Sequence, residues 1–161
     1  MHSCQGQCHC GNIGVEIQLS AQIHSITAQL CRCRFCRLHG AMWIGKPVHS
    51  LKLEAETAEH VQLYFDRSID ATYLLCSNCG TVASVLAFIE DKMHAAVNSN
   101  VLNLSPDVDL DVLHCQSHPN LTARQALRQD GWINEIDFCP ELQRRIFTGV
   151  KEEKRHSETL V

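Results

Sequence analysis

Seven of the ten cysteines in this 161-residue chain fall into three closely spaced groups, and no other feature constrains the fold as much. The groups are GQCHCG, with Cys8 and Cys10, CRCRFC, with Cys31, Cys33 and Cys36, and CSNC, with Cys76 and Cys79. The N-terminal residues lack the basic start and apolar stretch of a secretory signal peptide, so we expect a reducing, cytoplasmic location. In that compartment, closely spaced cysteines are typical of metal ligands rather than disulfides.

The composition excludes two classes of protein. Hydrophobic residues make up 45% of the chain and charged residues 20%, as in a globular protein, and the apolar runs are too short to cross a bilayer. The formal net charge of -4 argues against a nucleic-acid surface built on overall charge, because phosphate binding needs clustered basic residues. We therefore expect no membrane partner and no nucleic-acid surface that depends on overall charge, while the composition leaves a local basic patch open.

Alternating apolar residues predict a mainly β fold. Apolar side chains at Ile13, Val15, Ile17 and Leu19 are separated by polar residues or glycine, which is the two-residue period of a half-buried strand. Further short strands are expected at 25–30, 41–44, 51–53, 61–65, 72–75, 82–88, 94–97 and 108–112. Their spacing is typical of antiparallel sheets.

Helix signals are confined to the last third of the chain. Residues 121–129 are helix formers followed by a stop at Gly131, and Pro140 opens a second helix over 141–147 that should end before Gly149. Residues 151–161 are mostly charged or polar and are predicted to form a disordered tail. Residues 1–150 are predicted to form a single domain.

Two pairs of cysteines can complete one metal site. A strand places residues i and i+2 on the same face, so Cys8 and Cys10 can direct both sulfurs at one ion. Cys76 and Cys79 form a tight pair whose following glycine lets amides approach the sulfurs. Together the four thiols would form a closed tetrahedral zinc site.

The triplet Cys31, Cys33 and Cys36 is so compact that its thiols must share one ion if they bind any. Three protein ligands leave one tetrahedral position open, as in catalytic zinc sites. Alternatively, a fourth ligand closes the site as a second structural centre. His39, His114 and Cys115 are the candidates for that ligand, and spacing alone leaves both interpretations open.

The other cysteines have weaker patterns. Cys4 is expected to be a free thiol in a frayed terminus, and Cys139, which precedes Pro140, to be buried packing. Cys115 and His118 are spaced like a pair of metal ligands, but no second pair of ligands accompanies them. Cys115 is therefore expected to be a packed cysteine. Trp43 and Trp132 are expected in the core.

The segments GQCHCGNIGVE, LCRCRFCRLHGA and LLCSNCGT resemble, in order and spacing, the motifs of the glutathione-dependent formaldehyde-activating enzyme and centromere protein V family. The resemblance covers about residues 6–104 and implies a zinc-containing β-tent of small antiparallel sheets, with short C-terminal helices. It also implies two zinc ions per chain. Structural zinc would be held by Cys8, Cys10, Cys76 and Cys79, and catalytic zinc by Cys31, Cys33 and Cys36.

The activity that the resemblance implies is that of a carbon-sulfur lyase. Its substrate would be S-hydroxymethylglutathione or a similar adduct of a small thiol, such as glutathione, with formaldehyde or a related aldehyde. Arg37 belongs to the matched motif, whereas Arg32 stands where the family commonly has histidine. Together with Arg34 they can offset the thiolate charge or bind glutathione carboxylates in bidentate pairs, unless they are simply solvated.

Two other functions are compatible with the cysteines. A non-catalytic, zinc-stabilised binding module would match the resemblance to centromere protein V, although the chain lacks a long basic extension for chromatin. A metal or thiol-redox carrier would use the triplet for transfer or for a disulfide. Binding of glutathione at the metal would distinguish a lyase from a scaffold.

Overall fold

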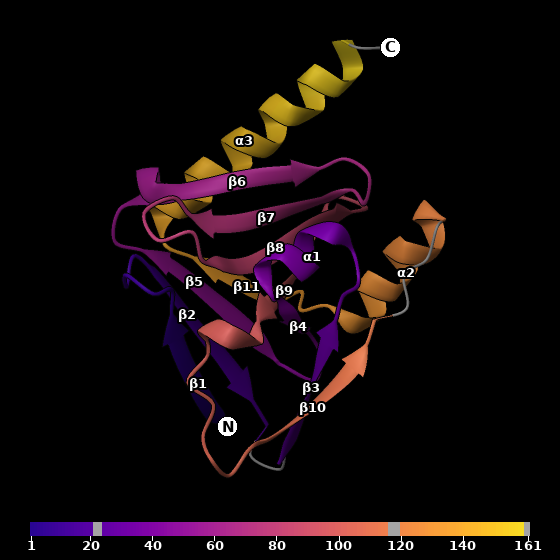
Figure 1. Ribbon diagram of the computed structural model, residues 1–161. Coiled ribbons are helices and arrows are strands. Elements are labelled where there is room, and N and C mark those ends of the chain that lie inside the picture. Colours follow the sequence, from indigo (N-terminus) through magenta and orange to yellow (C-terminus); the bar gives the residue numbers. More distant parts are fainter. Residues whose placement is uncertain (21–23, 116–119, 160–161) are drawn as a thin grey trace.

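Two β-sheets dominate the computed structural model, which describes residues 1–20, 24–115 and 120–159 (Figure 1). The first sheet has the strand order β1 (His2–Gln7), β2 (Ile13–Leu19), β5 (Ser50–Ala55) and β11 (Ile136–Phe138). The second has the order β10 (Asp109–His114), β3 (Ser25–Leu30), β4 (Met42–Ile44), β9 (Lys92–Asn98), β8 (Val82–Ile89), β7 (Ala71–Cys76) and β6 (Val61–Asp66). The prediction of a mainly β protein is confirmed.

Helices connect and flank the sheets. They are α1 (Arg34–His39), α2 (Leu121–Gly131) and α3 (Pro140–Thr159), with the 3₁₀ turns η1 (Ala58–His60) and η2 (Ser99–Val101). Asn120 caps α2 by accepting a hydrogen bond from the amide of Ala123, and Pro140 opens α3 as predicted. Within the described residues, no helix is long and apolar enough to cross a membrane.

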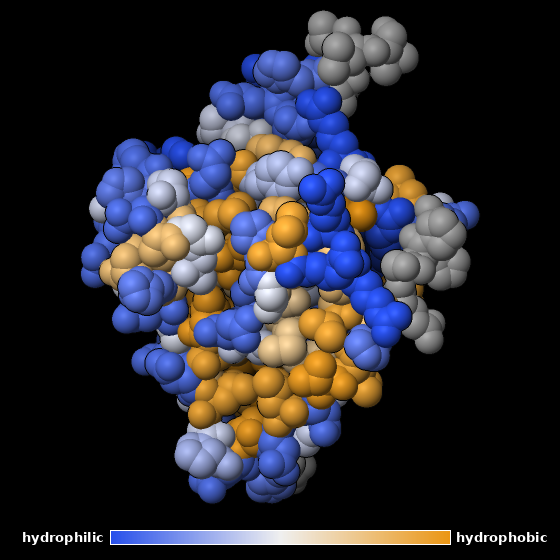
Figure 2. All heavy atoms as spheres, viewed as in Figure 1, coloured by the Kyte–Doolittle hydropathy of each residue, from blue (hydrophilic) through white to orange (hydrophobic). Residues whose placement is uncertain are grey.

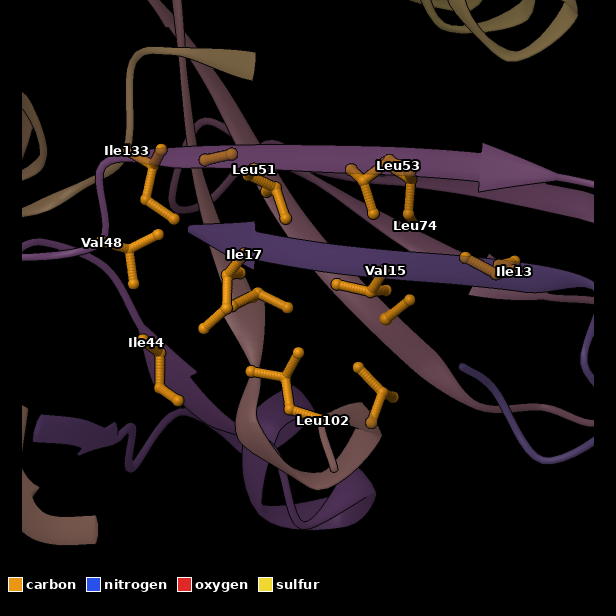
Figure 3. Close-up of a cluster of buried hydrophobic side chains, with 14 of the residues drawn as sticks. Ile13, Val15, Ile17, Ile44, Val48, Leu51, Leu53, Leu74, Leu102 and Ile133 are labelled. Atoms are coloured by element: carbon orange, nitrogen blue, oxygen red, sulfur yellow. The ribbon is translucent and has the colours of Figure 1, made fainter. Parts of the chain in front are cut away.

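The main core lies between the two sheets. Strand β2 buries every second residue, and its exposed fractions are at most 3% at Ile13, Val15, Ile17 and Leu19. Figure 3 shows the first three of these side chains, with Leu51 and Leu53 of β5, beside Ile44 and Leu74 of the second sheet. The alternation in the sequence therefore identified the apolar face that joins the sheets.

Two strand pairs differ from the predicted antiparallel arrangement. Strand β10 pairs with β3 in parallel, and β11 pairs with β5 in parallel. A parallel pair needs a long crossover connection, and in both cases a large part of the chain intervenes between the partners. The C-terminal third thus adds an edge strand to each sheet; β10 corresponds to the strand predicted at 108–112, whereas β11 was not predicted.

Helix α3 continues beyond the predicted stop at Gly149. A Cβ atom at Gly149 would lie 2.7 Å from Cδ1 of Leu63, so glycine lets the helix approach β6 closely. Farther along, the Arg67 guanidinium bonds the Glu153 carboxylate, and the Lys154 ammonium lies over the Phe88 ring at 5.9 Å. These contacts hold residues 151–154 in a helix that extends past the sheet in Figure 1, where the sequence predicted a disordered tail.

Gly6 joins the edge of the first sheet to the segment after η2. It forms an antiparallel bridge with Leu102, and the amide of Asn103 donates to the carbonyl of Gln5 at 2.9 Å. A Cβ atom at Gly6 would lie 1.8 Å from the carbonyl oxygen of Val101. Because that atom is backbone, the clash cannot be relieved by a side-chain rotation.

Gly6→Ala should therefore lower the free energy of unfolding by about 2 kcal/mol or more, as overpacking does in tight contacts. Gly14→Ala is the matched control, because its nearest neighbour is the Glu54 Cβ at an ordinary 3.9 Å. Thermal melts of the two metal-loaded variants provide the measurement. Equal melting temperatures would show that β1 is not held by this contact.

Candidate metal centres

Four sulfurs from two separate hairpin turns meet in the first centre. Cys8 and Cys10 precede β2, Cys76 ends β7, and Cys79 lies in the turn that leads to β8. Their four Sγ atoms all lie within 4.8 Å of one another, with separations of 3.7 Å from Cys8 to Cys10 and 3.5 Å from Cys10 to Cys76. Zinc-sulfur bonds of about 2.3 Å in a tetrahedron require sulfurs roughly 3.8 Å apart, so this group fits zinc.

Local backbone geometry brings each pair into place. Gly11 and Gly80 have φ angles of 86° and 76°, in the left-handed region that glycine adopts without strain. Their amides close tight turns on the carbonyls of Cys8 and Cys76 at 3.0 and 2.7 Å. The amide of Ile13 also donates to the Cys8 sulfur at 3.2 Å, which favours a thiolate there.

The pKa values of the cysteines in this centre indicate that a cation is needed to ionise all four thiols. Burial raises the pKa of Cys8 and raises the pKa of Cys76 to about 12. Hydrogen bonds from the Asn12 backbone and the Asn78 side chain lower the pKa of Cys10. All four sulfurs become thiolates only if a metal ion replaces the protons of the buried thiols.

The second centre lies at the junction between β3 and α1. The Sγ atoms of Cys31, Cys33 and Cys36 lie within 4.8 Å of one another. Cys33 is the N-cap of α1, and its sulfur accepts from the amide of Cys36 at 3.3 Å, so the first helical turn brings this pair together. Cys36 is buried, whereas Cys31 and Cys33 are partly exposed, so solvent reaches one side of the centre.

Two buried aromatic side chains direct polar groups at this centre. Nε1 of Trp43 donates to the Cys36 sulfur at 3.2 Å. The Tyr73 hydroxyl lies 3.7 Å from the Cys36 sulfur and 4.0 Å from that of Cys33. Burial and the negative charge of these thiolates raise the pKa of Tyr73, which keeps its hydroxyl protonated. Donors aimed at sulfur suit thiolates bound to a metal.

The same aromatic residues fix α1 against the second sheet. The Phe35 ring of α1 stacks on Tyr73 of β7 at 3.9 Å and on Tyr64 of β6 at 5.2 Å between centroids. His39 lies 4.3 Å from Phe35 at the exposed end of the helix. The sequence predicted that Trp43 lies in the core but not that it contacts a cysteine. It gave no signal for Tyr73, whose role depends on its strand neighbours.

Arg32, Arg34 and Arg37 are exposed around α1, where Figure 2 shows strongly hydrophilic side chains. Within the part of the chain that the structure describes, none of them forms an ion pair with a carboxylate. They therefore present positive charge to solvent beside the partly exposed sulfurs. That position is compatible with an anionic ligand and equally with plain solvation.

A fourth arginine, which the sequence analysis missed, lies inside the protein. Arg128 of α2 is 6% exposed and donates to the carbonyls of Ile69 and Asp70 at 2.7 and 2.8 Å. Its guanidinium stacks on Trp132 at 4.9 Å, and its charge acts on Tyr73 and Cys115. No local sequence pattern distinguishes Arg128 from Arg124, which lies one turn earlier and is only partly buried.

The other predicted ligands lie outside both groups. Neither His39, His114 nor Cys115 belongs to a described cluster of three or more close ligand atoms, and His118 lies outside the described residues. The amide of Cys115 nevertheless donates to the carbonyl of Leu30, next to Cys31, and Cys31 raises the pKa of Cys115. Cys139 packs against the core as predicted. Cys4 is a free cysteine outside both groups, as predicted, but the frayed terminus was wrong: β1 pairs along its whole length with β2, and Cys4 is buried in the core.

The two centres should differ in their effect on stability, since only the first joins distant strands. Cys76→Ser should remove a large part of the metal-linked folding energy, which is on the order of 10 kcal/mol for structural zinc. Cys33→Ser should leave the fold mostly intact. Melting temperatures with zinc bound test this difference.

Cys4→Ser is the control for that comparison, because it places a hydroxyl in the same core without removing a metal ligand. It should cost far less than Cys76→Ser. Equal losses of melting temperature in the Cys76 and Cys33 variants would contradict the division into a structural and an open centre.

Comparison with known proteins agrees with the cysteine motifs. The family model described as glutathione-dependent formaldehyde-activating enzyme matches residues 3–110. A crystal structure of a Rhodobacter sphaeroides protein is 25% identical and covers 66% of this chain and 98% of its own, with a TM-score of 0.46. The matched range includes both cysteine clusters.

Proposed function

Because this chain belongs to the glutathione-dependent formaldehyde-activating enzyme family, we propose that it is a cytoplasmic, zinc-dependent carbon-sulfur lyase. Its substrate class is the adduct of a small thiol with an aldehyde, with S-hydroxymethylglutathione as the representative. The observation that carries the proposal is the contrast between a group of four sulfurs and a partly exposed group of three. A three-ligand group leaves room for a substrate thiol.

Two zinc ions per chain are part of the proposal. Cys8, Cys10, Cys76 and Cys79 would hold the structural ion, and Cys31, Cys33 and Cys36 the second ion. Zinc at the second centre would favour the ionised form of a substrate thiol at neutral pH and stabilise it as a leaving group. The family's β-tent would then describe the two sheets, with residues 1–150 as the domain and 151–159 as a helical extension.

Different residues of the chain contact and stabilise the three sulfurs from different sides. Trp43 and Tyr73 donate toward Cys36 from the buried side, which holds that sulfur in place and leaves the approach from solvent to Cys31 and Cys33. Arg128 supplies a buried positive charge that acts on Tyr73 and on Cys115 beside the centre. Together they keep an anionic centre stable within a partly apolar site.

The exposed arginines give a basis for choosing glutathione among thiols. Glutathione carries two carboxylates, and a guanidinium binds a carboxylate in a bidentate pair. Arg32, Arg34 and Arg37 are exposed, and each directly follows one of the three cysteines in the chain. They would orient the carboxylates while the thiol reaches the open position, which lowers the entropic cost of bringing the reactants together.

Cobalt substitution tests the open position directly. Glutathione added to the cobalt-loaded protein should increase sulfur-to-metal charge-transfer absorption, whereas S-methylglutathione, which has no ionisable thiol, should not. Absorption titration of the two ligands gives the comparison. A spectrum that already shows four sulfur ligands at each ion and ignores glutathione would replace the lyase by a zinc scaffold.

The arginines have a separate test. Replacing Arg32, Arg34 and Arg37 together by alanine should weaken glutathione binding by about tenfold or more while changing the affinity of 2-mercaptoethanol little, because only glutathione has carboxylates. The matched control replaces Lys92, Arg144 and Lys151, which are exposed on other elements, and makes the same change in net charge. Calorimetry should separate the two variants. Equal weakening would mean that overall charge, not local recognition, attracts the ligand.

A further inference from the structure

Strand register brings Cys115 beside Cys31, although the two residues are far apart in the sequence. The parallel pair of β3 and β10 runs from Asp109 beside Ser25 to His114 beside Leu30. The amide of Cys115 then donates to the carbonyl of Leu30 at 3.0 Å, which continues the pairing by one residue. Neighbouring strands lie about 4.8 Å apart, and disulfides join residues whose Cα atoms are about 4.4–6.8 Å apart.

The two side chains also meet. They are close enough for each thiol to shift the pKa of the other, since Cys115 lowers the pKa of Cys31 and Cys31 raises that of Cys115, and both residues are partly exposed. Cys115 does not join the group of three sulfurs that lie within 4.8 Å of one another. It therefore touches one member of the second centre from outside instead of completing a four-sulfur shell.

We propose that Cys31 and Cys115 form a reversible disulfide that disables the second centre under oxidising conditions. The disulfide would convert Cys31 from a thiolate ligand into half of a cystine, leaving Cys33 and Cys36 as the remaining thiolates of that group. The disulfide depends on the two cysteines alone, whereas its effect on catalysis rests on the proposed function. The site is thus a modification site that also controls metal occupancy.

The chemistry balances with a peroxide as the oxidant. The Cys31 sulfur attacks one peroxide oxygen and becomes a sulfenic acid, and the other oxygen leaves as water. The Cys115 thiol then attacks the sulfenic sulfur, the sulfur-sulfur bond forms, and a second water leaves. Two thiols lose two electrons and two protons in total, and a dithiol reductant restores both thiols by exchange.

Peptide mapping can show which cysteine of the triplet forms this disulfide. Arginines at positions 32, 34 and 37 separate Cys31, Cys33 and Cys36 into different tryptic peptides. Cys31 is in the peptide 1–32, and Cys115 is the one cysteine in the peptide 93–124. After limited hydrogen peroxide treatment of the zinc-loaded full chain, we expect these two peptides linked, with fragmentation placing the bond at Cys31.

Zinc release provides the second readout. A chromogenic chelator should detect zinc leaving the oxidised wild-type chain, and dithiothreitol with added zinc should restore it. Cys115→Ser should bind as much zinc as wild type and release it severalfold more slowly under peroxide. Cys139→Ser is the matched control, because it removes another partly buried cysteine outside both groups and should behave as wild type.

Three outcomes would overturn the proposal. The first is a disulfide within the triplet in place of the Cys31–Cys115 link, and the second is equal zinc release from Cys115→Ser and wild type. The third is loss of zinc from Cys115→Ser before oxidation, which would make Cys115 a fourth ligand. If the link and the zinc release appear while glutathione fails to bind, the redox pair stands and the lyase does not.

Discussion

The convergence of four sulfurs from two sheets is the constraint on which the rest of the structure depends. Cys8 and Cys10 lie in the turn of the first sheet's β1–β2 hairpin, and Cys76 and Cys79 lie in the turn between β7 and β8 of the second. Apolar packing holds the sheets together across their faces. A metal ion in the first centre would fix them at one end, because four thiolates in contact are stable only around a metal ion.

Strand β7 relates the two centres to each other. Leu74 and Cys76 belong to the core between the sheets, whereas Ala71 and Tyr73 belong to the smaller cluster around Cys36 and Trp43. Alternation along one strand thus places a ligand of the first centre on one face and a donor to the second centre on the other. The position of the Tyr73 hydroxyl follows from the anchoring of Cys76 three residues later.

Local patterns in the sequence predicted much of this arrangement, and long-range pairing accounts for the rest. The alternation from Ile13 to Leu19 identified a core strand, and the spacing of the cysteines identified both sulfur groups. Helix α1 escaped prediction because it has six residues and is capped by a cysteine. Tyr73, Arg128 and the contact of Cys115 with Cys31 depend on strand and helix packing that no local pattern encodes.

The buried guanidinium of Arg128 links the second centre to a distant helix. Its hydrogen-bond acceptors are the neutral carbonyls of Ile69 and Asp70, and its compensating negative charge comes first from the Asp70 carboxylate and then from Tyr73 and Cys115. Without the Asp70 carboxylate, the desolvation cost of the cation would fall on the docking of α2. The local opening free energy of α2 would then report the charge beside this guanidinium, and faster amide exchange in this helix would accompany loss of that charge.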